Sequence, residues 1–367
     1  MGSVKDLTIL KLAYENQPGV GRFTFSDRYS VFDWGKMPDH IENKGRALAV
    51  MAAFNFEQLK KEGIKTHYRG LVSHNGNLIR FSDLKEGENG SNVMQVDMAV
   101  VYRPTPRLLL GDNGQPEAEY DYSFFENKSG ALNNYLIPLE IIFRNGLPVG
   151  SSVFKRIEEA KKRGPVEGEK ILHQIYESLG LKSEPKPGDM LPHPVMNFTT
   201  KLEPGDRTLS RFDAQVISGL HPSEFDDIPI AALKVNDIIS NQAKRTGFVH
   251  YDGKVEMLWK DSEAVICDVV GTFDEDRFGY KGEQVSKEFL RQVYEKNQPE
   301  FRKECDLWKK SGEGWQTRCP VKPKSLNPKL IEAVSQMYMA GCNQYVEKKI
   351  FDAPDLEKVM GELSPFR

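Results

Sequence analysis

Residues 248–280 read FVHYDGKVEMLWKDSEAVICDVVGTFDEDRFGY and give the clearest strand pattern in the chain. In its first part every second position is polar or charged, and the positions between are mostly apolar. Because side chains alternate between the two faces of a strand, this pattern predicts a strand with one face on the core and one polar face. The polar face would carry His250, Asp252, Lys254 and Glu256.

The chain then turns at KDS (260–262) and returns through VICDVV, where Asp268 is the single charged residue. A three-residue turn would place Asp268 opposite Glu256 on the same face, whereas a two-residue turn would direct Asp268 to the other face. A lone acid in an apolar strand is costly to bury unless it is paired or binds a metal. That cost counts against a hairpin face that is merely exposed to solvent, and both registers stay open.

Carboxylates on neighbouring strands, with a lysine between them, would suit a hard cation. Mg²⁺ prefers oxygen ligands and commonly joins one or two carboxylates to the phosphate groups of a substrate. The pattern therefore predicts a metal set of Glu256, Asp268 and Asp252, with Lys254 beside it. An exposed hairpin face with cross-strand ion pairs would give the same alternation, so this purely structural interpretation also stays open.

The chain of 367 residues is long enough for two lobes that share one cleft. Short apolar runs with turn signals predict antiparallel strands in the first third, interrupted by a helix at 44–63, and helices dominate later. A Pro-rich segment at 183–206 is predicted to be a loop. We therefore predict an α+β fold, with a mainly β lobe over 1–140 that includes an insertion at 104–134, and a larger α+β lobe over 141–367 with a helical C-terminal extension.

Composition narrows the class of partner. With 50 basic and 53 acidic residues and a formal net charge of −3, the chain has no electrostatic footprint for nucleic acid. No apolar run approaches the roughly 20 residues of a membrane span. Four scattered cysteines without a CxxC pair indicate idle thiols in a reducing compartment. We expect a cytoplasmic protein that binds small molecules, with the 104–134 insertion and the C-terminal extension as candidate contacts of a homo-oligomer.

A second polar strand lies in PLEIIFRNGLPVGSS (138–152), where Glu140 and Arg144 share one face. The glycine and serines that follow, including Ser151, precede a predicted helix and would offer amide and hydroxyl groups to a phosphate. An ordinary strand end with a helix N-cap would explain them equally well. Arg277 is predicted in a loop beyond the second carboxylate strand.

Taken in order, these segments resemble the SAICAR synthetase (phosphoribosylaminoimidazole-succinocarboxamide synthase) family of purine biosynthesis. PLEIIFRNGLPVGSS is similar to the family's PLEVVVRxxxxGS, FTTKLEPGDRTLS (198–210) to TPTTKxExGDHDxxIS, and FSDRYSVFDWGKMPDHIENKG (25–45) to DRISAFD…IPGKG. YDGKVEM, VICDVV and DEDRF match DxKxEFG, LxDE and PDxSRxW in turn. The resemblance covers most of the chain and implies a two-lobed fold with an ATP cleft between the lobes.

The resemblance also implies a ligase that joins carboxyaminoimidazole ribonucleotide (CAIR) to L-aspartate with ATP and Mg²⁺, through an acyl phosphate. It implies that Asp252 and Lys254 face the reacting groups. The implied nucleotide and metal contacts are Lys11, Lys201, Glu256 and Asp268. The implied substrate contacts are Ser30, Asp33, Lys44, Glu140, Arg144, Ser151, Asp206 and Arg277.

The opening strand departs from the family's GKxKxxY motif. In TILKLAY (8–14), Lys11 and Tyr14 match the second lysine and the tyrosine, whereas Thr8 and Ile9 replace the glycine and the first lysine. Loss of the glycine removes the close backbone approach that phosphate cradles need. Two alternatives therefore stay open: a family member that ligates a different carboxylate and amine, and a ribonucleotide-binding protein without catalysis.

Overall fold

The first sheet is built from the N-terminal part of the chain. The structure is a computed structural model that describes residues 4–110, 116–203, 205–312 and 314–366. Neighbouring strands of this sheet are antiparallel and follow the order β1 (Lys5–Lys11), β2 (Gly19–Phe25), β5 (Val93–Met98), β3 (Tyr68–Val72) and β4 (Leu78–Ile79). The short 3-10 helix η1 (Phe81–Asp83) follows β4.

A long helix, α1 (Lys44–Lys61), packs on this sheet. Its apolar residues recur at helical spacing, and Leu48 and Met51 are buried in the core. Gly63, with a φ of 76°, follows the helix end in the left-handed region that glycine adopts without strain. The helix predicted from the sequence is therefore confirmed.

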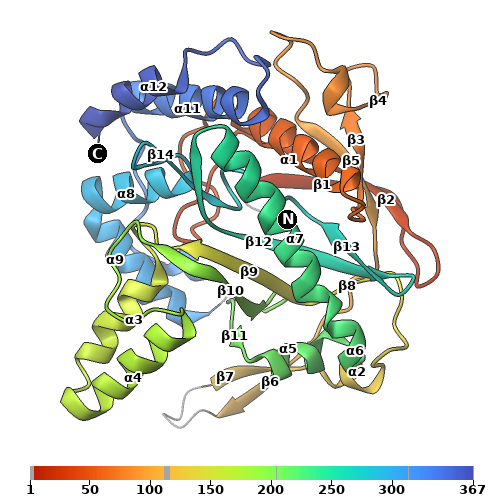
Figure 1. Cartoon of the computed structure of the whole chain (residues 1–367), viewed down its shortest axis with the longest axis vertical. Helices are drawn as coiled ribbons and strands as arrows, with labels where there is room; N and C mark the ends of the chain where they lie inside the picture. Colours follow the sequence, from red (N-terminus) through yellow and green to blue (C-terminus); the bar gives the residue numbers. More distant parts are fainter. Residues whose placement is uncertain (1–3, 111–115, 204, 313, 367) are drawn as a thin grey trace.

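The second sheet contains the segment 248–280, which carries the alternating polar and apolar residues. Its strands follow the order β11 (Thr208–Leu209), β10 (Met190–Thr200), β9 (Leu139–Gly146), β12 (Phe248–Lys260), β14 (Arg277–Tyr280) and β15 (Glu283–Gln284). Two more strands, β8 (Tyr135–Leu136) and β13 (Glu263–Cys267), pair with the second half of β12. Helix α7 (Asp227–Arg245) crosses β9 and β12 on one face (Figure 1).

The two sheets are joined beside β13. Thr66 forms a parallel bridge with Ile266, and the backbone N–H of His67 donates to the Ile266 carbonyl oxygen at 2.9 Å. The carbonyl of His67 in turn accepts from the N–H of Asp97 at 2.7 Å. Residues 66 and 67 therefore tie the end of β5 to the hairpin of β12 and β13, which brings the first sheet close to the carboxylate strands.

The remaining elements are mostly helices. In chain order they are β6 (Thr105–Leu110), β7 (Pro116–Asp121), α2 (Ser123–Asn127), α3 (Ser152–Lys161), α4 (Pro165–Ser178), α5 (Arg211–Ser218), α6 (Pro222–Phe225), α8 (Lys287–Asn297), α9 (Pro299–Trp308), η2 (Lys309–Ser311), α10 (Trp315–Arg318), α11 (Pro328–Val346), α12 (Leu356–Leu363) and η3 (Ser364–Phe366). Helix α11 packs on α1, so the C-terminal helices lie against the N-terminal part of the fold (Figure 1). The α+β class with antiparallel sheets is confirmed, and none of the described helices is both long and apolar enough to cross a membrane.

The turn between β12 and β13 has two residues, not three. Lys260 pairs with Glu263, and the two residues between them have positive φ angles of 52° and 60°, as the tight turns of two-residue hairpins require. Glu256 therefore lies opposite Cys267 instead of Asp268. Of the two registers that the sequence left open, the structure has the two-residue one, and the cost of burying Asp268 is relieved in another way, described with the site.

The regular alternation along β12 is also interrupted. Between His250 and Asp252 the pairing with β14 shifts by one residue, which marks a β-bulge at Tyr251. His250 consequently lies on the α7 face, where its Nδ1 contacts Ser240 Oγ at 2.8 Å. The prediction that His250 shares the polar face with Asp252 is wrong, since a bulge reverses the side that later residues face.

Three segments predicted as loops contain strands. The Pro-rich segment includes β10, whose pairing with β9 is irregular between Met190 and Val195, and the prolines at 192 and 194 lie in that irregular stretch. Arg277 is the first residue of β14 instead of a loop residue. The 104–134 insertion contains the antiparallel pair β6 and β7 and the helix α2.

Candidate active site

The polar side chains of the second sheet gather on the face opposite α7. On β9, Ile141 and Phe143 are buried in the main core, so the residues of opposite parity, Glu140 and Arg144, point to the other face. On β12 the corresponding residues pair with them in register, since Asp252 lies opposite Arg144. Alternation beyond the bulge therefore brings the predicted charged residues of both strands to one surface, as the sequence analysis expected.

A network of lysines and carboxylates occupies one end of this surface. Lys201, just after β10, places its Nζ atom 2.9 Å from Glu140 Oε1 and 2.6 Å from Glu256 Oε1. The Nζ atom of Lys254 lies 2.6 Å from the same Glu140 oxygen and 3.5 Å from Glu275 Oε2. Glu140 is thus shared by two ammonium groups. If either lysine moves to a ligand, the carboxylate of Glu140 keeps the other lysine as its ion-pair partner.

Asp268 reaches this network through an unusual backbone conformation. Its φ angle is 62°, in the left-handed region that few non-glycine residues adopt. In a regular strand of this register Asp268 would face away from Glu256, and the left-handed residue at the end of β13 redirects its side chain. The carboxylate forms an ion pair with Lys5 of β1. We call the whole set the front cluster: Lys5, Glu140, Lys201, Lys254, Glu256 and Asp268.

The charges of the front cluster depend on each other. Burial, reinforced by the charge of Asp268, raises the pKa of Glu256 above its ordinary value. Burial alone would also raise the pKa of Asp268, but Lys5 and Lys201 lower it. Burial opposes the charge of Lys254, yet Glu275 and Glu140 raise its pKa well above the usual range. The two adjacent carboxylates are therefore compensated by ammonium groups in this structure, and a metal ion would provide the same compensation.

An arginine cluster lies at the other end of the same surface. Arg277 binds both carboxylate oxygens of Asp252, with Nε donating to Oδ1 at 2.8 Å and Nη2 donating to Oδ2. Arg144 donates from Nη1 to Ser151 Oγ at 3.4 Å, and among the described residues its buried Nε has no hydrogen-bond partner. Ser151 is the N-cap of α3, whose first amides point to this region. Two guanidinium groups, a hydroxyl and a helix N-terminus can bind a phosphate group.

Asp252 does not join the predicted metal set. Arg277 occupies its carboxylate, and among the residues the structure describes no three His, Cys, Asp or Glu side chains are arranged to hold a metal. The remaining acidic pair, Glu256 and Asp268, fits a cation that also binds phosphate oxygens, because Mg²⁺ is commonly held by one or two carboxylates plus phosphates.

Several predicted residues lie outside the front cluster. Lys44 is fully buried with its Nζ 2.5 Å from Asp274 Oδ2, so the structure places it in the core instead of on the cleft. Ser30 Oγ accepts from the N–H of Gly35 at 3.1 Å and stabilises a local turn. Asp33 is exposed and pairs with Lys309 at 2.7 Å.

Two further predicted residues differ in their relation to the cluster. Asp206 lies on the loop after β10, where partial desolvation and the charge of Glu140 raise its pKa. It is therefore electrostatically coupled to the cluster. Lys11 is exposed at the far end of β1, and no side-chain hydrogen bond or ion pair joins it to any residue the structure describes. The structure does not bring Lys11 to the front cluster.

Two lysines near the site were missed by the sequence analysis. Lys5 was missed because a lysine near the N-terminus has no local signal for a contact with Asp268, 263 residues away. Lys287 begins α8, and burial lowers its pKa despite the nearby acids Glu275 and Asp274. None of the described residues forms a hydrogen bond or ion pair with the Lys287 side chain, so it is free to bind an anionic ligand.

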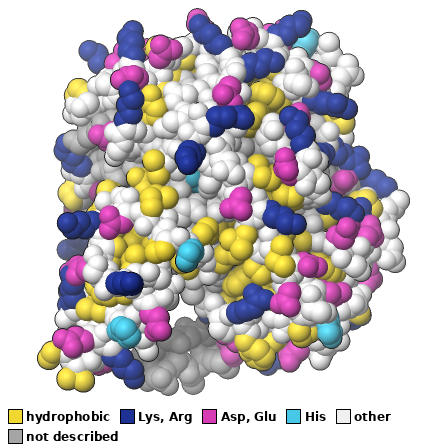
Figure 2. Space-filling view, viewed as in Figure 1, with side chains coloured by type: hydrophobic (Ala, Val, Ile, Leu, Met, Phe, Trp, Pro, Cys, Tyr) yellow, Lys and Arg dark blue, Asp and Glu magenta, His cyan; other side chains and the backbone are white. Residues whose placement is uncertain are grey.

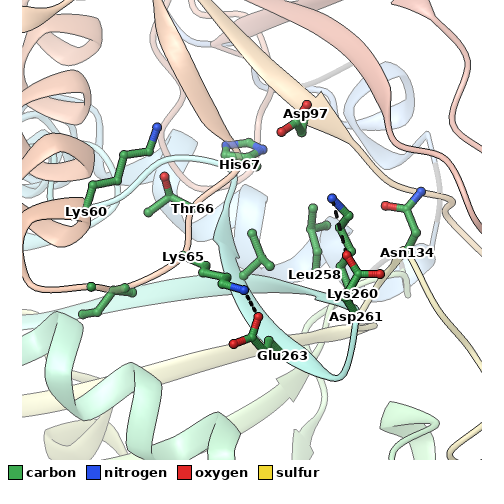
Figure 3. A pocket seen from close by; sticks show the side chains of 13 residues that line it. Lys60, Lys65, Thr66, His67, Asp97, Asn134, Leu258, Lys260, Asp261 and Glu263 are labelled. Atoms are coloured by element: carbon green, nitrogen blue, oxygen red, sulfur yellow. Dashed lines mark hydrogen bonds and ion pairs between the residues drawn. The ribbon is translucent and has the colours of Figure 1, made fainter.

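A cavity of about 370 Å³ lies beside the hairpin of β12 and β13, where Leu258 and Glu263 are among its lining residues (Figure 3). His67 lines it and also contacts the Asp268 carbonyl oxygen through Nε2 at 3.1 Å. Lysine and acidic side chains both line the cavity, and Lys65 and Glu263 form an ion pair across part of it (Figure 3). Figure 2 shows the same mixture of positive and negative side chains over one whole face of the molecule.

The fold and the two clusters suit an α+β enzyme that handles phosphate groups. The sequence model of the SAICAR synthetase family matches residues 10–307. A protein of Archaeoglobus fulgidus, provisionally named phosphoribosylaminoimidazole-succinocarboxamide synthase, is 42% identical over 364 residues, which cover 99% of this chain and 98% of that protein. The chain belongs to the SAICAR synthetase family.

Solved structures show the same fold. A SAICAR synthase from Saccharomyces cerevisiae, complexed with SAICAR, has a TM-score of 0.58 at 20% identity and covers 95% of this chain and 94% of its own. A SAICAR synthetase in complex with ADP has a TM-score of 0.50 at 19% identity, with 89% of this chain and 99% of that chain covered. The family assignment made from the motifs is therefore confirmed.

Proposed function

We propose that this protein is an ATP-dependent ligase that joins CAIR to L-aspartate and releases ADP and phosphate. The observation that carries the proposal is the front cluster, where two carboxylates suited to a metal lie beside lysines suited to a phosphoryl group. The synthase names of the matched relatives and the ADP in one structure with the same fold support the same activity. The lysine and carboxylate set also argues against a protein that only binds ribonucleotide, which would have no need of it.

Glu256 and Asp268 would hold Mg²⁺ on the nucleotide. The pair fits because burial beside Asp268 raises the pKa of Glu256, and a bound cation would relieve that electrostatic cost. The metal would supply neutralisation of the phosphate charges. Lys201, which contacts Glu256 at 2.6 Å, would lie beside the same phosphates.

The phosphate of the ribonucleotide would bind at the arginine cluster. The buried Nε of Arg144 has no partner in the described part of the chain, and an anionic oxygen would satisfy it. Ser151 and the amides at the start of α3 supply further donors. Arg277 would complete the site while it holds Asp252 in place.

The reaction would take place between the two clusters. A carboxylate oxygen of CAIR would form a bond to the γ-phosphorus while the bond to ADP breaks, and Lys254 would stabilise the transferred group. The amine of aspartate would then form a bond to the acyl carbon, and phosphate would leave with the carboxylate oxygen. The amine gives up a proton, which the departing phosphate can accept. Lys287, whose side chain has no hydrogen-bond or ion-pair partner among the described residues, would be available to bind a substrate carboxylate.

We also propose that the lobe boundary falls near residue 140 and that the nucleotide lies between the first sheet and the hairpin of β12 and β13. The ion pair of Lys5 with Asp268 supports this arrangement because it joins the two sheets at the site. The four cysteines are free and buried, which supports a reducing, cytoplasmic location.

The test is to measure ADP release and product mass with Mg²⁺-ATP and CAIR, with and without L-aspartate. We expect ADP release that depends on aspartate and a product with the mass of the succinocarboxamide. ADP release with another amine but not with aspartate would indicate a different ligase. Binding of CAIR without turnover under any of these conditions would favour the non-catalytic alternative and reject the proposal.

A further inference from the structure

A buried hydrogen-bonded pair, His250 and Asp276, lies beside the arginine cluster. His250 Nε2 lies 2.9 Å from Asp276 Oδ2, and the two side chains are 1% and 0% exposed. Asp276 directly precedes Arg277, the first residue of β14, whose guanidinium group binds Asp252. The pair is therefore one residue away from an arginine that the proposed function assigns to the ribonucleotide phosphate.

The carboxyl group of Asp276 packs against the backbone of β12 at Gly253. A Cβ atom at residue 253 would lie 2.4 Å from Asp276 Cγ, which is closer than non-bonded atoms approach. Gly253 lies between Asp252 and Lys254, and consecutive residues of a strand point to opposite faces. The Asp276 carboxyl group therefore fills the space behind the part of β12 that carries these two site residues.

His250 is held in place by α7 and β14. The bulge at Tyr251 directs His250 to the α7 face, and its ring stacks on Phe278 with the centroids 5.0 Å apart. A neutral imidazole that donates from Nε2 to Asp276 leaves Nδ1 to accept from the hydroxyl of Ser240, at 2.8 Å. Contacts thus run from α7 through His250 to Asp276, and they can hold the start of β14 against β12.

A carboxyl group at this position is costly. Burial raises the pKa of Asp276 to about 6, and its Oδ1 atom has no hydrogen-bond partner among the described residues. Where DEDRF matches the motif PDxSRxW, Asp276 stands at the serine. Core packing alone would not require a carboxyl group here, since a hydroxyl or apolar side chain would avoid this cost.

We propose that His250 and Asp276 are positioning residues for Arg277, which they hold through the backbone in the orientation that binds Asp252 and the ribonucleotide phosphate. The inference rests on the proposed function, since it needs that phosphate at the arginine cluster. His250 and Asp276 act from the opposite face of the sheet and through Arg277. A small displacement of a positioned binding group is enough to weaken its contact with a substrate strongly.

The first test removes the donor to Asp276. His250→Leu should raise the Kd and the KM for CAIR about tenfold, the size expected for a weakened charge-assisted contact, with kcat and the KM for ATP nearly unchanged. His250→Gln, whose side-chain amide can donate to the same carboxylate oxygen, should keep most of the affinity for CAIR. Calorimetry without ATP gives the Kd, and steady-state kinetics gives kcat and both KM values.

The second test concerns the packing against Gly253. Gly253→Ala places a methyl group on the carboxyl group of Asp276, and Asp276→Ser vacates that space, so each variant alone should weaken CAIR binding. The double variant Gly253→Ala/Asp276→Ser should bind CAIR more tightly than either single variant, because the methyl group fills the vacated space. Additive losses in the double variant would reject the proposal. If His250→Leu does not fold, this set of variants decides the question.

A control variant separates positioning from stability. Ser335→Ala removes a hydrogen bond from the buried Ser335 hydroxyl to the Glu42 carbonyl oxygen, at 2.6 Å, on α11 and outside both clusters. It should lower the Tm and leave the Kd for CAIR unchanged. If the variants of His250 and Asp276 behave in the same way, with lower Tm and wild-type Kd, the pair supports only the fold and the inference is rejected.

The outcomes also separate this inference from the proposed function. If the wild type binds CAIR but ligates no amine, the proposed ligase fails, whereas the role of His250 and Asp276 is still decided by the CAIR affinities of the variants. If the wild type binds no CAIR, both are rejected. If the wild type is a ligase and the variants keep its Kd and KM for CAIR, only the positioning role is rejected.

Discussion

The front cluster and the pair of Lys44 with Asp274 use the same chemical groups in different surroundings. In the front cluster Lys201 and Lys254 keep 27% and 29% of their side chains exposed and share Glu140 between them. Lys44 is sealed, and Asp274 accepts a second hydrogen bond from the hydroxyl of Tyr338 at 2.9 Å. Redundant, accessible ion pairs can exchange a partner for a ligand, whereas a sealed pair has no replacement for a lost partner.

The role of a lysine in a family motif therefore depends on its burial as well as on its position in the motif. A sealed ammonium group fixes the packing of α1 and α11 around it, and its removal leaves a carboxylate uncompensated in the core. An accessible ammonium group can be removed with little loss of folding free energy but with a large loss of catalytic activity. The comparison therefore predicts that a variant of a front-cluster lysine loses activity, whereas a variant of Lys44 loses stability.

The largest effect is expected for Lys254→Met. We predict a fall in kcat on the order of 10⁴-fold, because the transferred phosphoryl group loses an adjacent positive charge. The free energy of unfolding should change by less than about 1 kcal/mol, since Glu140 keeps its contact with Lys201 at 2.9 Å. Single-turnover kinetics and urea unfolding measure the two quantities. A large loss of stability with normal turnover per folded molecule would show that Lys254, like Lys44, supports the fold instead of the reaction.

Lys44→Met should show the opposite behaviour. It leaves Asp274 buried without its cation, and we expect a loss of about 3–5 kcal/mol in the free energy of unfolding. The double variant Lys44→Met/Asp274→Asn serves as the control and should recover part of that loss, because no uncompensated charge remains. If instead stability is unchanged and the KM of a substrate rises, Lys44 is a substrate contact as the resemblance implies.

A buried histidine next to the front cluster extends the comparison to the pH dependence of the free energy of unfolding. Burial lowers the pKa of His67 to about 4, so the unfolded chain binds a proton at higher pH than the folded one. Stability that is present above about pH 6.5 is therefore lost as the pH falls toward 4, by about 2–3 kcal/mol at pH 4.5. His67→Gln should lack this component. Urea unfolding at pH 7 and pH 4.5 tests it, and equal pH dependence in both proteins would contradict it.

The smallest effect is expected at the arginine cluster. Arg144→Lys keeps the positive charge but loses the planar fork and the Nε donor that has no partner among the described residues. The KM for the ribonucleotide should rise about tenfold, with kcat nearly unchanged. Loss of kcat without a change in KM would place Arg144 at the reacting centre. Steady-state kinetics with varied CAIR distinguishes the two outcomes.

Much of the fold was predictable because its signals are local. The helical spacing in α1 and the alternation along β9 depend on neighbours in the sequence, and both were confirmed, whereas the alternation along β12 holds only beyond the bulge at Tyr251. The motif order also predicted the family correctly. The strand β10 was missed because the prolines within it suggested a loop, although the irregular pairing there accommodates them.

The sequence predicted which residues form the site better than it predicted how their side chains are arranged. The members of the front cluster were anticipated from the sequence, apart from Lys5 of β1. The two-residue turn, the left-handed Asp268 and the bulge at Tyr251 each change which face a side chain points to. A pattern of period two cannot reveal a shift of one residue, so these features lay beyond the sequence analysis.

Periodicity and motif order were enough to predict the α+β class, most of the elements, the family and the identity of most charged groups at the site. Only the tertiary structure decided which charges meet. It sealed Lys44 against Asp274, engaged Asp252 with Arg277 and brought Lys5 to Asp268. The physical reason is that pairing and solvent access depend on contacts between residues far apart in the chain, and these set whether an ion pair supports the fold or remains available to a ligand.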